Sequence, residues 1–369
     1  MTTPISVQQV TEIMEALVKT PSTSNNEGQV RRFLENYLGN MGYKTSIDQV
    51  GNLIVEVPGT LGRTRGKPLL YNAHMDRVPP GLSCIPVVKD GIMYGDGKTN
   101  LGSDDAAGIA IILLAIHALH ERKLSHGPLL LLFTVAEEIG VKGAQAFQQE
   151  QWGVTDGIIF DNAGEPGTVI MRGSAYIAFD VTLHGRTGHP AKELSGTASA
   201  IEMFRKLDLP LGIQDDGNTR LSIGLIEGGS ARNAIPDVLK LKGEMRTLLP
   251  IDGQERWKQH IKEAFDTVAA EYGGSAEVVF DSHGSAYEVD EKDPLLQLYR
   301  RAWELRGEVF QTMWTFVGSD ANALRSRMRV FTVSTGAQNE HTLAECIRLE
   351  PLVKIAEAAV TVAQEYNGL

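Results

Sequence analysis

The sequence contains little cysteine, a minority of positive charge and no long apolar run. Cys84 and Cys346 are the two cysteines among 369 residues. Two are too few for a disulfide framework or a zinc–thiolate site, and this favours a reducing compartment such as the cytoplasm. Lysine and arginine number 35 against 46 aspartates and glutamates, which gives a net charge of −11 at pH 7. That sign argues against a nucleic acid or an anionic membrane as a partner.

Several common signatures are also missing. The longest apolar run, Ala106–Leu119, is too short to cross a bilayer, and no basic region followed by an apolar core opens the sequence, so we expect no export signal. The sequence has neither the G-x-S-x-G motif of serine hydrolases nor the H-E-x-x-H motif of single-zinc proteases. A Gly-Lys-Thr triplet occurs, but five residues separate Gly91 from Gly97 where a Walker A loop needs four. We therefore expect no nucleotide-binding loop.

The length predicts about two domains. Up to residue 172 apolar strand-like segments alternate with helix-like ones, which predicts a mostly parallel α/β sheet with helices on both faces. The helical segments are Val7–Val18, Gly28–Met41 and Asp104–His120, and the strands are Leu53–Val57, Pro68–His74, Gly127–Val135 and Asp156–Asn162. We expect the ligand site of such a sheet at the carboxyl ends of its strands.

The pattern changes after Gly173. The next strand alternates apolar and polar residues, as a half-exposed strand does, and the order β-α-β-β-α-β that follows resembles a ferredoxin-like sandwich. From about Pro294 the alternation of helix and strand returns. We therefore expect one mixed α/β domain, formed by residues 1–172 and 287–369, with an α+β domain inserted at residues 173–286.

Histidines and carboxylates follow the predicted strand ends or open the buried helix. They are His74, Asp76, Asp104, Glu137, Glu138, Asp161 and His341. Because the carboxyl ends of parallel strands meet at one edge, we expect these side chains to lie together. Two imidazoles and three carboxylates can hold two divalent ions if one carboxylate bridges them. A hydrolytic site also needs a base that is not a ligand, and two adjacent glutamates can supply one of each.

Each of these residues has a simpler interpretation when it is taken alone. Asp104 is more often a helix N-cap, Asp161 a turn carboxylate, and a Glu-Glu pair a solvated surface charge. His74 alone is more often an ordinary polar residue. For the site to be absent, these simpler interpretations would all have to be true at once, at five places on one predicted edge of the sheet. We therefore favour a metal site.

Five ordered motifs then give a resemblance to a known superfamily. They are HMD, GSDDAAG, the Glu-Glu pair in FTVAEEIGVKGA, FDNAG and EHT, with an inserted domain between the last two. The whole chain resembles the dizinc exopeptidases and amidohydrolases that include peptidase T, carboxypeptidase G, succinyl-diaminopimelate desuccinylase and aminoacylase. It is most similar to the peptidase T-like branch, through LGSDDAAG, GSDAN and the aspartate at position 161.

The resemblance implies a role for each matching residue. Asp104 would bridge two zinc ions, with cobalt or manganese as alternatives, and Glu137 would be the general base. The remaining ligands would be His74 and Asp161 for one ion and Glu138 and His341 for the other, with Asp76 orienting His74. Two positions depart from the branch, because Ala106 follows the aspartate pair where lysine is common and Arg77 follows HMD where threonine or serine is common.

The resemblance also implies that the inserted domain is a lid through which the protein forms a homodimer. His189 would stabilise the oxyanion in the neighbouring subunit's site, and Asn233 would contact substrate. Arg246 would pair with a substrate carboxylate, for which its planar guanidinium is suited.

We therefore expect a cytoplasmic zinc exopeptidase that hydrolyses short peptides, most simply a tripeptide aminopeptidase. Within the superfamily, a carboxypeptidase or an amidohydrolase of N-acyl amino acids remains an alternative. A non-catalytic relative that binds a peptide or a metal is a more distant one.

Overall fold

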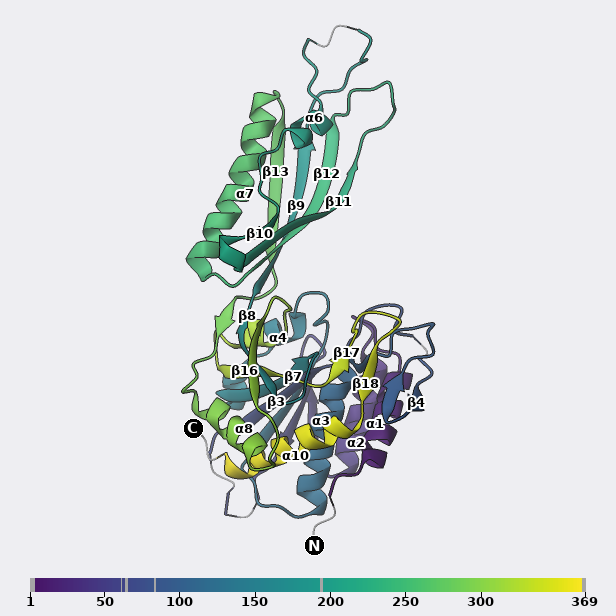
Figure 1. Cartoon of the computed structure of the whole chain (residues 1–369), viewed down its shortest axis with the longest axis vertical. Coiled ribbons are helices and arrows are strands. Elements are labelled where there is room, and N and C mark those ends of the chain that lie inside the picture. Colours follow the sequence, from purple (N-terminus) through teal and green to yellow (C-terminus); the bar gives the residue numbers. More distant parts are fainter. Residues whose placement is uncertain (1–3, 61, 64–65, 83, 193–194, 367–369) are drawn as a thin grey trace. The chain divides into compact units, whose positions relative to one another are not determined.

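The computed structural model describes residues 4–60, 62–63, 66–82, 84–192 and 195–366, and it divides into two compact units (Figure 1). The first unit is formed by the chain up to Arg172, by Glu288–Thr315 and by the chain from Ser319 onward. The second unit is formed by Gly173–Tyr287 and the short segment Phe316–Gly318. This architecture confirms the expected fold class, a mixed α/β domain with an α+β insert.

The first unit is built on a mixed sheet. Among the described residues it has the order β1-β2-β6-β3-β7-β16-β8-β14, with β15 also paired to β8. Its strands are β1 (Lys44–Ile47), β2 (Leu53–Val57), β3 (Leu69–His74), β6 (Leu129–Thr134), β7 (Asp156–Asn162), β8 (Thr168–Gly173), β14 (Tyr287–Glu288), β15 (Gln311–Thr315) and β16 (Arg329–Ser334). The central strands β6, β3, β7 and β16 are parallel, so their carboxyl ends lie along one edge.

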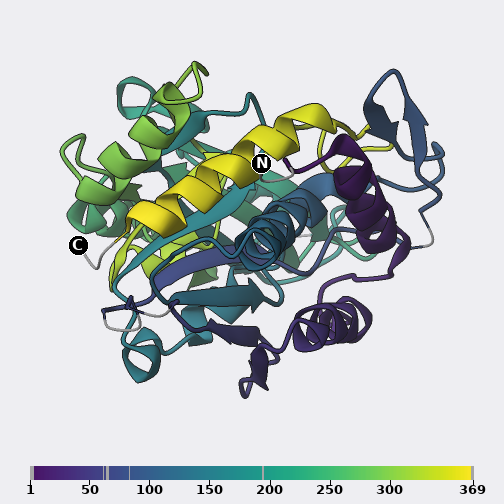
Figure 2. The same cartoon turned by 90° about the horizontal axis from the view of Figure 1, so that it is seen from below.

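Helices pack on this sheet because its central strands are apolar on both faces. The helices of the unit are α1 (Val7–Lys19), α2 (Gly28–Asn40), α3 (Ser103–Glu121), α4 (Lys142–Ala146), α5 (Gln149–Trp152), α8 (Pro294–Glu304), α9 (Ala321–Leu324) and α10 (Glu350–Glu365). Helices α1, α3 and α10 pack against one another, and α3 lies on β3 and β7 (Figure 2, α10 in yellow). Helix α2 packs instead on β1 and β2.

Helix α3 is the central helix of the unit, since it is apolar on nearly all sides and therefore buried. By length and composition it could cross a membrane, but 83% of its apolar window is buried inside the protein. On the neighbouring strand, Tyr71 donates a hydrogen bond to the carbonyl oxygen of Ala359 in α10 and meets the ring of Phe160 edge to face. These contacts fix β3, the strand that ends in His74.

The second unit is an antiparallel sheet covered by two helices on one face. The strand order is β10-β11-β12-β9-β13, in which β11, β12, β9 and β13 have the ferredoxin-like arrangement. Its elements are β9 (Ala175–His184), α6 (Ala200–Arg205), β10 (Gly212–Gln214), the 3-10 turn η1 (Asp215–Gly217), β11 (Thr219–Gly228), β12 (Val238–Thr247), α7 (Ile251–Glu271) and β13 (Ser275–Ser282). Its core contains Phe179 and Val181 of β9, Leu241 of β12 and Phe265 of α7.

A small sheet in the first unit was not expected from the sequence. It has the order β17-β18-β5-β4 and consists of β4 (Val87–Lys89), β5 (Ile92–Tyr94), β17 (Ala337–Gln338) and β18 (Cys346–Arg348). Because β17 and β18 flank His341, this sheet holds both ends of the loop that carries it. Strands of two or three residues have too little hydrophobic alternation to be recognised in a sequence.

The contact between α3 and β7 gives a stability prediction. A Cβ added at Gly108 would lie 2.0 Å from the carbonyl oxygen of Phe160, whereas one added at Gly39 in α2 would meet nothing within 4 Å. Gly108→Ala should lower the free energy of unfolding by about 1–3 kcal/mol through overpacking, as measured by urea denaturation. Gly39→Ala, the matched control, should be neutral or stabilising. Equal stability of the two variants would contradict the close packing.

Candidate metal centre and its surroundings

The parallel register brings two of the predicted ligands together. Strand β3 pairs with β7 from Leu69 opposite Asp156 to Asn72 opposite Ile159. Continued by two residues, that register sets His74 opposite Asp161. Side chains of neighbouring parallel strands at the same register lie on the same face, so both point to one side of the sheet.

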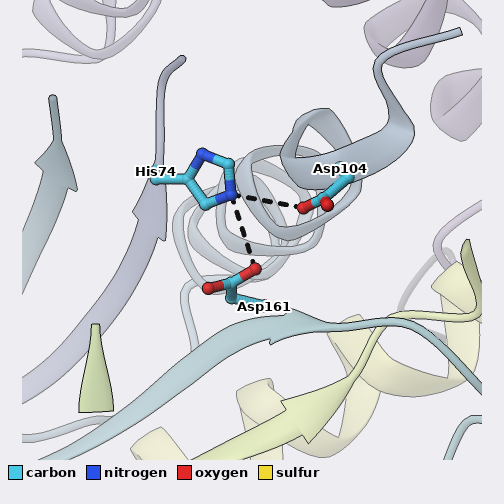
Figure 3. Close-up of side chains that lie close together, drawn as sticks. All are labelled: His74, Asp104 and Asp161. Atoms are coloured by element: carbon cyan, nitrogen blue, oxygen red, sulfur yellow. Dashed lines mark hydrogen bonds and ion pairs between the residues drawn. The ribbon is translucent and has the colours of Figure 1, made fainter. Parts of the chain in front are cut away.

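His74, Asp104 and Asp161 form the first group of possible metal ligands (Figure 3). His74 Nε2 lies 3.2 Å from Asp104 Oδ1 and 3.4 Å from Asp161 Oδ1. The His74 side chain is 1% exposed, so these carboxylates are close to a nitrogen that water scarcely reaches.

Asp104, Glu138 and His341 form a second group that shares Asp104 with the first. His341 Nε2 lies 3.2 Å from Asp104 Oδ2 and 3.1 Å from Glu138 Oε2. The two oxygens of Asp104 therefore face different imidazoles, which is the geometry required of a carboxylate that bridges two ions. In each group the candidate ligand atoms lie within 4.8 Å of one another.

Burial and mutual charge shift the pKa values in this cluster. Burial opposes the charge of His74, but the carboxylates of Asp161 and Asp104 raise its pKa well above the usual value. Burial raises the pKa of Asp161 to about 7 against the opposing effect of His74. Hydrogen bonds with Asp104 and Glu138 raise the pKa of His341 to about 10. The site therefore retains protons near neutral pH that a cation would displace.

The donor set fits divalent metal ions. Carboxylate oxygens and imidazole nitrogens are ordinary ligands of zinc and of similar transition metals. His74 presents Nε2 to the cluster, while its Nδ1 lies 2.9 Å from the main-chain oxygen of Asp76. A histidine ligand usually has its second nitrogen hydrogen-bonded in this way, which fixes the tautomer and the ring orientation.

The carboxylate of Asp76 does more than face His74. It lies 3.5 Å from Nδ1 of His74, and its two oxygens accept hydrogen bonds from the main-chain N–H groups of Glu137, at 2.9 Å, and Glu138, at 3.2 Å. The sequence-based prediction assigned Asp76 only to the orientation of His74. In the structure its carboxylate also holds the turn that carries the two glutamates.

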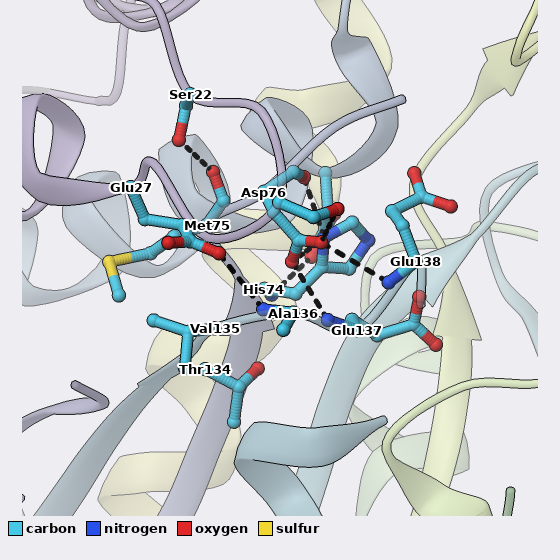
Figure 4. A network of polar contacts seen from close by, with 12 residues as sticks. Ser22, Glu27, His74, Met75, Asp76, Thr134, Val135, Ala136, Glu137 and Glu138 are labelled. Atoms are coloured by element: carbon cyan, nitrogen blue, oxygen red, sulfur yellow. Dashed lines mark hydrogen bonds and ion pairs between the residues drawn. The ribbon is translucent and has the colours of Figure 1, made fainter. Parts of the chain in front are cut away.

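The two adjacent glutamates lie beyond the end of their strand. Strand β6 ends at Thr134, and Ala136 has a left-handed conformation with φ of 52°, so the alternation of side chains stops before Glu137. Figure 4 shows both glutamate side chains on the side of the turn away from Glu27. Burial and the charge of Asp161 raise the pKa of Glu137 well above the usual value. A carboxylate with a raised pKa is a better proton acceptor than one at its usual pKa.

Two further carboxylates, to which the sequence analysis assigned no role, support the main chain at His74 and Asp104. Glu345, which is 1% exposed, accepts hydrogen bonds from the N–H groups of Gly102 and Asp104 and from the hydroxyl of Ser103. Asp105 accepts hydrogen bonds from the N–H groups of His74 and Gly108. The sequence signal was the position of Glu345, four residues after His341, but only the fold shows what it contacts.

A third carboxylate lies within the motif GSDAN, to which the sequence assigned no definite role. Asp320 is 1% exposed, and its Oδ2 accepts hydrogen bonds from Asn72 and from the hydroxyl of Thr134. Its charge contributes to the raised pKa of Glu137 and of Asp161.

The two departures from the family pattern have different surroundings. Ala106 is a buried residue of α3. Arg77 is 4% exposed, and its guanidinium donates hydrogen bonds to the carbonyl oxygens of Val18 and Thr20 at the carboxyl end of α1. A cation is favourable at that end of a helix dipole. Arg77 also packs against Gly102, where an added Cβ would lie 2.7 Å from its side chain.

The three remaining predicted residues belong to the second unit. His189 and Asn233 are exposed, and their loops are joined by a hydrogen bond from Ile235 N–H to the carbonyl oxygen of Gly188. Arg246 of β12 donates a hydrogen bond to the carbonyl oxygen of Phe316, and its guanidinium lies 4.3 Å from the centre of the Tyr176 ring. Their roles toward substrate stay predictions.

Comparisons with known proteins agree with this geometry. Residues 70–365 match the model of peptidase family M20/M25/M40. The protein YqjE of Bacillus subtilis (strain 168) is 29% identical over 372 residues, covering 98% of this chain and 99% of that protein.

Two solved structures have the same fold. The aminopeptidase PepT of Bacillus cereus ATCC 10987 is 29% identical with a TM-score of 0.90, and a tripeptidase of Staphylococcus aureus is 25% identical with a TM-score of 0.92. Each covers 98% of this chain and 99% of its own. The matches confirm the resemblance to the peptidase T-like branch, and the chain belongs to peptidase family M20/M25/M40 and hydrolyses peptide bonds.

Proposed function

We propose that this protein is an aminopeptidase that removes the N-terminal residue of short peptides, tripeptides first among them, with two zinc ions bound in the groups that share Asp104. Cobalt and manganese are alternative ions for the same ligands. The observation that carries the proposal is that two groups of possible metal ligands share Asp104. The neighbouring Glu137 belongs to neither group and is available as a base. The likeness to an aminopeptidase and a tripeptidase of nearly equal length supports this substrate class.

The chain's own residues divide the chemistry as follows. His74, Asp104 and Asp161 would hold one ion, and Asp104, Glu138 and His341 the other. When bound, the ions would polarise the scissile carbonyl and make a water molecule more acidic. Glu137 takes the proton of the attacking water and later delivers it to the leaving amine.

The second unit contributes the roles that the resemblance implies. In this proposal His189 stabilises the oxyanion, Asn233 contacts the substrate, and Arg246 binds a substrate carboxylate. The proposal also includes a homodimer formed through this unit and a cytoplasmic location, in line with the acidic, cysteine-poor composition.

The role of Glu137 can be tested by its removal. Glu137→Ala should lower kcat by at least about 100-fold because no other base replaces the lost carboxylate. The metal content, measured by plasma mass spectrometry, should stay near two ions per chain because Glu137 belongs to neither ligand group. Glu150→Ala, at an exposed position of α5, is the matched control. Retained turnover in the Glu137 variant would exclude it as the base.

The direction of peptide cleavage can be tested with a panel of di- and tripeptides and their blocked forms. N-acetylation should abolish hydrolysis by an aminopeptidase, whereas C-terminal amidation should weaken it by about 10- to 100-fold through loss of the contact with Arg246. Arg246→Ala should reduce kcat/KM for the free acid and leave the amidated peptide nearly unchanged. Cleavage of acetylated peptides or N-acyl amino acids would instead indicate a carboxypeptidase or an amidohydrolase.

Metal binding should depend on pH because the metal-free site holds protons. Asp161, with a pKa of about 7, and His341, with a pKa of about 10, must each lose a proton before they can ligate. The affinity for zinc should therefore rise with pH between about 6 and 8, and binding at neutral pH should release protons. Calorimetry in buffers of different ionisation enthalpy measures this release. An affinity that does not change over this range would contradict the protonation of the site.

A further inference from the structure

The segment Ser22–Glu27 lies between α1 and α2 and contacts residues that adjoin the candidate ligands. We call it the N-terminal brace. The hydroxyl of Ser22 donates a hydrogen bond to the carbonyl oxygen of Met75. The carbonyl oxygen of Ser22 accepts a hydrogen bond from Arg77 N–H at 2.9 Å. The hydroxyl of Ser24 donates to Asp76 Oδ2 at 2.7 Å. The brace therefore holds the main chain on both sides of Asp76 and also the carboxylate of Asp76.

Glu27 extends this support to the turn that carries the two glutamates (Figure 4). Its Oε1 accepts hydrogen bonds from Ala136 N–H at 3.1 Å and from Asn25 N–H at 2.8 Å. Glu27 is only 5% exposed. It occupies the N-cap position of α2, but its side chain makes no capping hydrogen bond there. A buried glutamate that contacts a distant turn instead of capping its own helix indicates a role at that turn.

Three consecutive N–H groups of the turn are bound by two carboxylates. Glu27 accepts from Ala136, and Asp76 accepts from Glu137 and Glu138. Ala136 has φ of 52°, a conformation that a residue with a Cβ adopts only when its surroundings hold it. The directions in which the Glu137 and Glu138 side chains leave the backbone depend on this conformation.

We propose that Glu27 is a positioning residue that aims Glu137 at the reacting water and Glu138 at its metal ion. The proposal rests on the proposed function for its catalytic part and on the ligand groups alone for its metal-binding part. Glu27 acts through the position of its Oε1 atom, because the hydrogen bond to Ala136 N–H needs an acceptor at that place.

Two conservative variants separate position from charge. Glu27→Gln keeps the length of the side chain and an acceptor oxygen but removes the charge, whereas Glu27→Asp keeps the charge and withdraws the oxygen by one methylene. Glu27→Asp should lower kcat by about 10- to 100-fold with little change in KM, and Glu27→Gln should stay close to wild type. Both are measured on the best tripeptide of the panel, with circular dichroism and a melting curve to show that the fold is kept.

Cobalt binding provides a readout that does not need turnover. Because Glu138 lies in the same turn, Glu27→Asp should weaken one of two cobalt equivalents by about 10- to 100-fold and alter the visible spectrum of the cobalt-loaded protein. Glu27→Gln should keep both equivalents and the spectrum. Glu12→Asp and Glu12→Gln, at an exposed glutamate of α1, are the matched controls.

The outcomes divide clearly. Wild-type kcat and cobalt affinity in Glu27→Asp would overturn the proposal. A loss in Glu27→Gln equal to that in Glu27→Asp would also overturn it, because an acceptor oxygen at that place would then not be sufficient. If the wild-type protein binds two cobalt ions but cleaves no peptide of the panel, the proposed function fails. The cobalt titrations of the two Glu27 variants then still decide the role of Glu27.

Discussion

The carboxylate of Asp104 lies between two imidazoles, with one oxygen facing His74 and the other facing His341. The arrangement of the site depends on this contact, because it joins a ligand from a central strand to one from a loop far along the chain. Although burial opposes its charge, hydrogen bonds from His341 and His74 hold the pKa of Asp104 well below the usual range. It therefore stays charged, as the bridging role that we propose for it requires.

A cluster of buried acids is unfavourable unless something compensates for their charge. Here the compensation comes partly from protonated histidines. It comes also from main-chain N–H groups that donate hydrogen bonds to the carboxylates around the site. Asp76, Asp105 and Glu345 each accept hydrogen bonds from two main-chain N–H groups. Glu345 accepts a third from the hydroxyl of Ser103. These acids are not in the two ligand groups, and they fix the backbone from which the ligands project.

Much of the architecture could be predicted from the sequence because its signals are local. Three apolar runs predict buried strands, and these form β3, β6 and β7. A longer apolar stretch predicts a core helix, which is α3. The short strands β4, β5, β17 and β18 gave no such signal, since two or three residues cannot establish a period. The segment Phe316–Gly318, which belongs to the second unit, was equally invisible because its neighbours along the chain belong to the first.

The sequence by itself determined the kinds of ligand available and their order along the chain, because residue type sets donor chemistry and the motifs are contiguous. Only the tertiary structure decided which atoms meet. Asp104 meets both imidazoles, Asp76 accepts hydrogen bonds from the turn of Glu137 and Glu138, and Glu27 accepts one from Ala136. These contacts join residues that are 30 to 237 positions apart in sequence. Spacing along the chain carries no information about such contacts, because they arise from strand register and from loops that pack across the edge of the sheet.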